Sequence, residues 1–151
     1  MIIQGKGNIL DTNDEAVVNT VNEQGVMGKG LALEFKIRFP DNFTAYEVAC
    51  KRNEVKVGQM FVTERMDMFG PRWLINFPTK QYWRNGSRLE WVRAGLDDLR
   101  TFITARSIRS ISVPPLGCGN GGLDWRVVRP LIVDKLGNLP DCAVSIFEPI
   151  D

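Results

Sequence analysis

The spacing of apolar residues along the chain predicts strands that alternate with helices. Short apolar runs are typical of buried strands, and apolar positions three and four residues apart are typical of amphipathic helices. The predicted strands cover residues 2–3, 16–21, 60–62, 73–77, 108–113 and 142–147, and the predicted helices cover residues 30–39, 43–51, 87–106 and 125–136. This alternation predicts an α/β domain with a largely parallel sheet.

Three signals refine the boundaries of these elements. Ser87, with Glu90 three residues later, forms a capping-box pattern and predicts that the longest helix begins at Ser87. Pro78 is expected to end the strand before it. Residues 30–39 alternate like a strand, but their Leu, Ala, Glu and Lys content and the preceding glycine turn favour a helix that stops at Pro40.

Composition narrows the class of protein. The chain has 151 residues, 44% of them hydrophobic, and a net charge of +1, which suits one globular domain over residues 1–151. No apolar run is long enough to span a membrane. The three cysteines stand at unrelated spacings, so we expect no disulfide framework and a cytoplasmic location. The absence of histidine argues against a Ser-His nucleophile and against a metal site.

Two glycine-rich runs, "GVMGKGLAL" at 25–33 and "GCGNGG" at 117–122, each follow an apolar run and precede a predicted helix. The first lacks the Ser or Thr that follows the lysine of a P-loop. The second matches G-x-G-x-x-G, but too few residues remain for the rest of a dinucleotide-binding domain. Glycines let backbone N–H groups approach an anion. Either run alone is compatible with a simple tight turn, but together they predict a diphosphate held at one edge of the sheet.

A third segment, "KQYWRNGSR" at 80–88, mixes aromatic and cationic residues. This mixture is compatible with a solvated loop and helix face. It also suits single-stranded nucleic acid, whose bases stack on aromatic rings while its phosphates meet cations.

The quoted motifs, together with "GKGNIL" at 5–10, "VVNT" at 17–20, "PPL" at 114–116 and an aromatic residue at 147, resemble the macrodomains. The segment "INFPTKQYW" at 75–83 resembles the subgroup that contains the human terminal ADP-ribose glycohydrolase and the bacterial DarG antitoxins. The resemblance spans nearly the whole chain. It implies a three-layer α/β/α fold around a six-stranded mixed sheet, and ADP-ribose as the ligand.

The resemblance also implies an ordered set of ligand contacts. Asn8, Ile9 and Phe147 would flank the adenine; Met27, Gly28, Lys29, Gly30, Leu31, Gly117, Cys118, Gly119, Asn120 and Gly121 would wrap the diphosphate and distal ribose; Thr20, Asn22 and Thr79 would line the distal end. The chain departs from the family at two places. Many macrodomains have an aspartate where Asn8 stands, and the human relative has a catalytic aspartate in its second glycine loop, where this chain has no carboxylate.

Removal of ADP-ribose normally uses two carboxylates, which the glycine runs do not supply. Lys80 is the alternative catalytic residue. If it is held among Phe77, Tyr82 and Trp83, partial desolvation would lower its pKa. It would then protonate or polarise the leaving base, or attack the opened sugar as an amine. Asn22 is the expected orienting partner, through its amide. A solvated lysine and a turn asparagine are the ordinary alternatives.

The DarG-type resemblance implies a hydrolase that removes ADP-ribose from thymine in single-stranded DNA. It would act as the antitoxin to a DarT-type DNA ADP-ribosyltransferase toxin. Trp83 would then stack on a base, and Arg84 and Arg88 would meet phosphates. Such antitoxins commonly carry a further C-terminal domain, and we expect a monomer without a cofactor. A reader that binds ADP-ribose without cleaving it, and a deacetylase or esterase for small ADP-ribose adducts, remain alternatives.

Overall fold

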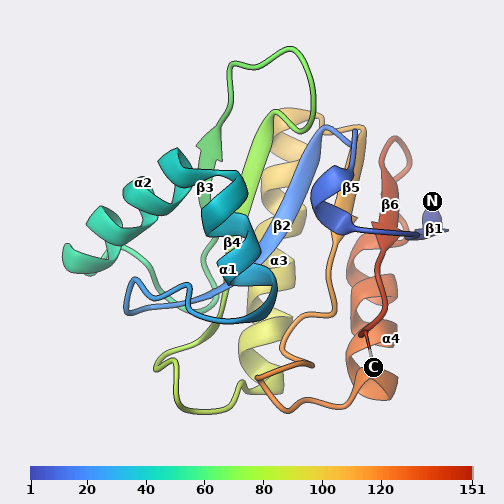
Figure 1. The fold of residues 1–151 in the computed structure, drawn as a ribbon. Helices are drawn as coiled ribbons and strands as arrows, with labels where there is room; N and C mark the ends of the chain where they lie inside the picture. Colours follow the sequence, from blue (N-terminus) through green and yellow to red (C-terminus); the bar gives the residue numbers. More distant parts are fainter. Residues whose placement is uncertain (151) are drawn as a thin grey trace.

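A computed structural model of the chain describes residues 1–150, in which six strands form one mixed sheet (Figure 1). The strands are β1 (Ile2–Gln4), β2 (Ala16–Asn22), β3 (Phe61–Glu64), β4 (Trp73–Lys80), β5 (Ser110–Val113) and β6 (Ala143–Ile146), in the order β1-β6-β5-β2-β4-β3. Every neighbouring pair is parallel except β3 with β4. The predicted six-stranded, largely parallel sheet is therefore confirmed.

Four α-helices cover the sheet, two on each face. They are α1 (Gly30–Arg38), α2 (Pro40–Lys51), α3 (Leu89–Arg106) and α4 (Trp125–Leu136), and a short 3-10 helix, η1, spans Ile9–Asp11. One apolar core lies between the sheet and α3 with α4, while two smaller clusters lie under α1 and α2 on the opposite face (Figure 1). This is the predicted three-layer α/β/α arrangement. Within residues 1–150, no helix combines the length and apolarity needed to cross a membrane.

Helix α3 begins at Leu89 rather than at Ser87, so the predicted capping box is wrong. The residue at the cap is Arg88, and its side chain makes no capping hydrogen bond. The Ser87 N–H instead donates to the carbonyl of Gly121 at 2.9 Å. Ser87 thus ties the loop before α3 to the second glycine run, and this tertiary contact outweighs the local capping preference.

Pro78 acts differently from the prediction, and Pro40 has a second role that was not predicted. Strand β4 continues through Pro78 to Lys80, beyond the last residue that pairs with β3, Asn76. Past that point β4 has a partner on one side only, where proline is tolerated. Pro40 ends α1 as predicted but also occupies the first turn of α2, where a missing N–H costs no helical hydrogen bond. The second helix therefore starts three residues earlier than predicted.

Three loops gather at the carboxyl-terminal edge of the sheet. They follow β2, β4 and β5 and cover residues 23–29, 81–88 and 114–124 (Figure 1, bottom). In open α/β sheets this edge is the usual place for a ligand. The fold therefore brings both glycine runs and the basic-aromatic segment to one end of the molecule.

Candidate functional site

A cleft of about 880 Å³ opens between the three loops. Its size falls in the range of small-molecule and cofactor sites. Most of its walls come from residues predicted as ligand contacts, with the predicted catalytic Lys80 and two predicted DNA contacts, Trp83 and Arg84, among them: Thr20, Asn22, Gly28, Lys29, Gly30, Leu31, Thr79, Lys80, Trp83, Arg84, Gly117, Gly119, Asn120 and Gly121. Val21, Val26, Ala32, Pro114 and Pro115 complete the lining and were not predicted. Val21, Val26 and Ala32 each adjoin a predicted contact in the sequence, and the proline pair precedes the second glycine run, so their positions in the motifs could have signalled them.

The first glycine loop is braced by the side chain of Asn22, which is buried at the end of β2. The Asn22 Nδ2 donates to the carbonyl of Val26 at 2.8 Å, and its Oδ1 accepts the Gln24 N–H at 2.9 Å. The Tyr46 hydroxyl donates to the same Oδ1 at 3.0 Å and to the Asn22 carbonyl at 2.7 Å. The amide oxygen is thus engaged in shaping the loop. A contact from Asn22 to the distal ribose, through the remaining amide hydrogen, stays a prediction.

The glycines of the two loops differ in whether the fold itself requires them. Gly30 and Gly117 have φ of +54° and +72°, a conformation that other residues adopt only with strain. Gly28 and Gly119 have no such φ. A Cβ on Gly119 would meet nothing within 4 Å, and one on Gly28 would touch only a Val26 methyl at 3.6 Å. The fold itself does not require glycine at these two positions, which is the pattern expected where a ligand approaches the backbone.

The cleft favours an anion. A Cβ on Gly30 would lie 3.9 Å from the Nδ2 of Asn120, so the two loops face each other closely. Helix α1 begins at Gly30 and directs its partial positive charge here. Among residues 1–150, those lining the cleft include the cations Lys29, Lys80 and Arg84 and no carboxylate. Backbone amides, a helix terminus and cations together suit a diphosphate.

Lys80 lies at the end of β4, where its Nζ donates to the carbonyl of Trp83 at 3.3 Å. Partial burial lowers the pKa of the Lys80 ammonium, and the nearby charge of Lys29 lowers it further. The predicted direction of the shift is therefore confirmed. The surroundings differ from the prediction, since Phe77 packs against Gly95 of α3 and the Tyr82 side chain is 56% exposed outside the cleft.

An apolar cluster adjoins one end of the cleft. Phe147 and Leu31 pack in it together with the buried Ile9, and Leu31 also lines the cleft. Asn8 lies beside this cluster, where its Oδ1 caps η1 by accepting the Leu10 N–H at 3.0 Å. The structure therefore brings together the residues predicted to flank an adenine. Asn8 already uses its oxygen for one hydrogen bond.

Two predicted contacts have side chains that face away from the cleft. Met27 is buried in the cluster under α2. Cys118 packs against the core on the opposite face, and burial, aided by the charge of Asp124, raises the pKa of its thiol to about 11. The raised pKa disfavours the thiolate, which is the nucleophilic form of cysteine. Any contact from these two residues to a ligand would come from the backbone.

The basic-aromatic segment lies partly at the rim of the cleft and partly outside it. The Trp83 N–H donates to the Gln24 Oε1 at 3.0 Å, which fixes Trp83 at the rim of the cleft. The Arg84 guanidinium lies over the Trp83 ring at 4.7 Å from its centroid. Arg88 lies outside the cleft, with its guanidinium 5.4 Å from the centroid of Trp91.

Residues 18–132 match the family model described as "Macro domain". The chain belongs to the Macro domain family. A Mycobacterium tuberculosis relative named "DNA ADP-ribosyl glycohydrolase" is 52% identical over 149 residues, which make up 99% of this chain and 42% of the relative. A Thermosipho africanus relative, named as a fusion of a DNA ADP-ribosyl transferase and a DNA ADP-ribosyl glycohydrolase, is 32% identical over 97% of this chain and 41% of its own length. The chain therefore spans about two fifths of these curated relatives.

Solved macrodomain structures agree with this fold. The macrodomain of Mycobacterium tuberculosis DarG superposes with a TM-score of 0.98 at 52% identity, over 99% of both chains. Thermosipho africanus DarTG, solved in complex with ADP-ribose, superposes with a TM-score of 0.89 at 34% identity, over 95% of this chain and 40% of the other. The resemblance predicted from the sequence motifs is confirmed.

Proposed function

We propose that this macrodomain removes ADP-ribose from thymine bases of single-stranded DNA. The observation that carries the proposal is the position of Lys80 in the wall of the cleft, where partial burial lowers the pKa of its ammonium. It stands at the end of a cation-lined cleft shaped for a diphosphate. The activity named for the two relatives gives independent support.

The cleft would bind ADP-ribose mainly through its backbone. The diphosphate would lie between Gly28 and Gly119, where the fold leaves room for close approach. The adenine would stack near Phe147, beside Leu31. The distal ribose would then point toward Thr79 and Lys80, at the end of β4. This orientation puts the scissile bond within reach of the lysine.

The chemistry is hydrolysis of an N-glycosidic bond. The bond between the anomeric carbon of the distal ribose and a thymine nitrogen breaks. Water supplies a hydroxyl to the sugar, and the base gains a proton. In this proposal the Lys80 ammonium donates a hydrogen bond or a proton to the leaving base, which stabilises the negative charge that develops on it. Asn22 holds the loop that faces this charge.

The DNA strand would leave the cleft along the basic-aromatic segment. Trp83 lines the rim and is 41% exposed. Because the Arg84 guanidinium covers one face of its ring, a base would stack on the other face. Arg84 stands beside Trp83, and Arg88 lies further along the same loop. These cations would meet phosphates.

A role as antitoxin to a DarT-type DNA ADP-ribosyltransferase follows from the same proposal. The fusion of the two activities in the Thermosipho africanus relative supports it. Co-expression with such a toxin tests it directly: growth should be rescued by the wild-type chain, and continued killing despite well-expressed protein would contradict the role.

A reader function is the second candidate, because no carboxylate lines the cleft within the described residues. Incubation with ADP-ribosylated single-stranded DNA, ADP-ribosylated protein and O-acetyl-ADP-ribose in parallel separates the candidates, with calorimetry to measure ADP-ribose binding. Release of ADP-ribose from the DNA alone is the expected result. Tight binding without release from any substrate would identify a reader, and turnover of O-acetyl-ADP-ribose alone would identify an esterase.

A further inference from the structure

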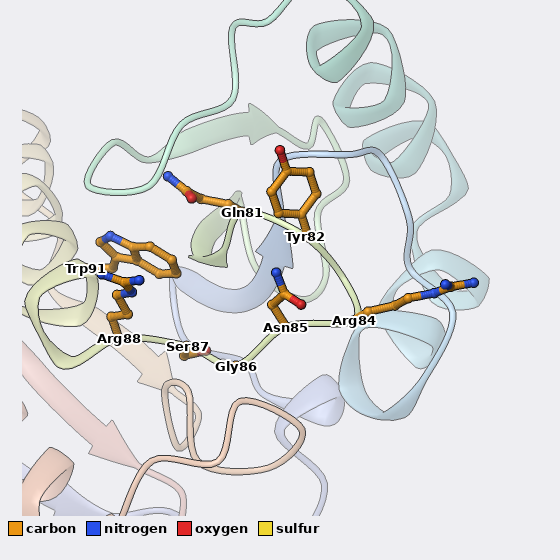
Figure 2. Close-up of a pocket in the computed structure, with 8 residues that line it drawn as sticks. All are labelled: Gln81, Tyr82, Arg84, Asn85, Gly86, Ser87, Arg88 and Trp91. Carbon is orange, nitrogen blue, oxygen red and sulfur yellow. The ribbon is translucent and has the colours of Figure 1, made fainter.

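A second hollow, of about 590 Å³, lies beside the cleft. Seven of its lining residues belong to the loop between β4 and α3, and the eighth is Trp91 in the first turn of α3. Figure 2 shows Trp91 and Gln81 on one side and Tyr82 and Asn85 on the other, with Gly86 and Ser87 below them. Arg84 lines both this hollow and the cleft.

The side chains around the hollow suit a nucleobase. Tyr82 and Trp91 supply aromatic faces, on which bases of any identity stack. Gln81 and Asn85 supply amides, each with hydrogen-bond donors and an acceptor, and neither side chain is bonded to another group within residues 1–150. The Arg88 guanidinium lies over one face of Trp91, 5.4 Å from the ring centroid, and pairs with the Glu90 carboxylate at 3.5 Å. A base would therefore stack on the other face of Trp91, with this cation near its phosphate.

The loop that carries these side chains is anchored at both ends. The Trp83 N–H bonds to Gln24 of the first glycine loop, and the Ser87 N–H bonds to Gly121 of the second. Gly86 also lies close to the Gly121 carbonyl, where a Cβ would come within 3.2 Å of the oxygen. The hollow is therefore held in a defined place relative to the cleft, and Gln81 directly follows Lys80 in the chain.

We propose that this hollow holds the base next to the modified nucleotide. The inference rests on the proposed DNA substrate and adds a second recognition site to it. A strand whose modified thymine lies at Lys80 continues past Trp83 and Arg84, and its next base enters between Tyr82 and Trp91. The enzyme then recognises two nucleotides, and the amides of Gln81 and Asn85 make it sensitive to the neighbouring base.

The test compares three substrates: ADP-ribosylated thymidine, an ADP-ribosylated single-stranded oligonucleotide, and the same oligonucleotide with abasic neighbours. We expect wild-type kcat/KM to be about tenfold higher on the intact oligonucleotide than on the abasic one, as loss of one stacked base implies. Trp91→Ala should remove this preference and leave hydrolysis of the nucleoside unchanged. Asn85→Ala, on an exposed part of the loop, should reduce discrimination among neighbouring bases, measured on oligonucleotides that differ only in the base next to the modified thymine.

Phe69→Ala is the matched control, because Phe69 is an exposed aromatic residue on the β3–β4 loop at the opposite end of the molecule (Figure 1). It should behave as wild type on all three substrates. Equal rates of the wild type on the intact and abasic oligonucleotides would overturn the second site alone. So would equal losses in Trp91→Ala and Asn85→Ala on the nucleoside and on the oligonucleotide. No hydrolysis of any substrate by the wild type would overturn the proposed function and this inference with it.

Discussion

The cleft and the hollow beside it are built in opposite ways. The cleft lies at the ends of buried strands and between two glycine loops, whereas the hollow is formed by mostly exposed residues of the loop between β4 and α3 together with Trp91 of α3. Backbone N–H groups bind a diphosphate whichever side chains surround them, so affinity in the cleft is spread over many positions. In the hollow, each side chain contributes separately. We therefore expect substitutions of single side chains to change turnover or DNA recognition more than they change the affinity for ADP-ribose.

Buried polar groups beneath the first glycine loop explain why the cleft is preformed. The Asn76 Nδ2 of β4 donates to the Asn42 Oδ1 of α2 at 2.9 Å and to the Phe61 carbonyl of β3 at 3.0 Å. The Asn19 Nδ2 of β2 contacts the Met27 sulfur at 3.8 Å. Asn19 also donates to the Asn76 Oδ1 at 3.4 Å, so these contacts link Met27 of the loop to β2, β4 and α2. Buried polar networks favour one arrangement of the chain, and in this one the Asn19 Oδ1 alone has no hydrogen-bond partner among residues 1–150. The exposed hollow has no such network within the same residues.

The largest expected effect is that of Lys80→Ala on turnover. General acid–base groups contribute about 10²- to 10⁴-fold, so release of ADP-ribose from DNA should fall at least about 100-fold. Affinity for ADP-ribose should stay within about tenfold, because the backbone groups that hold the diphosphate remain. Single-turnover kinetics and calorimetry measure the two effects separately.

Lys80→Arg is the matching control for charge. The guanidinium keeps its proton, so Arg should fail to restore turnover if Lys80 transfers a proton. A near-normal rate in Lys80→Ala would show that Lys80 is an ordinary solvated lysine, and the mechanism would be wrong while the macrodomain assignment stood.

Gly119→Glu should give the opposite result, a loss of binding and turnover together by roughly 100-fold or more, since unpaired like charges in a shielded site cost several kcal/mol. The space around Gly119 is open and its φ is not positive, so the melting temperature should change little. Calorimetry with ADP-ribose and a thermal melt check both expectations. Unchanged affinity would show that the diphosphate lies elsewhere.

Gly122→Ala is the control in the same loop. Gly122 has φ of +78° and does not line the cleft, so alanine there strains the backbone without touching the ligand. We expect a loss of roughly 1 kcal/mol in the free energy of unfolding and near-normal ADP-ribose affinity. Denaturant unfolding measures the first quantity.

Most of the fold was predictable because the apolar pattern is local and strong. The approximate ranges of the strands and helices and the parallel sheet follow from it, whereas the helical assignment of 30–39 came from residue content and the glycine turn before it. The errors come from tertiary contacts. Ser87 is drawn to Gly121 rather than to the helix start, and Pro78 continues β4 because β3 ends beside Asn76. Gly121 and β3 are too far from Ser87 and Pro78 in the sequence for a local pattern to predict these contacts.

The candidate site was predictable where backbone determines it and less so where side-chain direction does. The glycine runs and Lys80 reach the cleft as expected. Phe77 does not surround Lys80, because alternation along β4 turns its ring toward α3. Trp91 carried no signal as a ligand contact, since its spacing is that of an ordinary helix residue. Only the turn of the chain after β4 brings it beside Gln81.

The smallest predicted effect concerns Lys29, whose charge helps to lower the pKa of Lys80. Lys29→Gln removes that repulsion, so the pKa of Lys80 should rise. If protonated Lys80 is the active form, kcat falls as pH rises through this pKa, and in the variant the falling limb moves to higher pH. On the falling limb, the activity of the variant should exceed that of the wild type by less than about tenfold, because partly exposed charges are screened.

Saturating substrate removes any effect of Lys29 on binding, and Lys36→Gln on the outer part of α1 controls for net charge. High salt should shrink the difference. An activity that instead rises with pH, with its limb moved the same way, would identify the neutral amine as the reactive form.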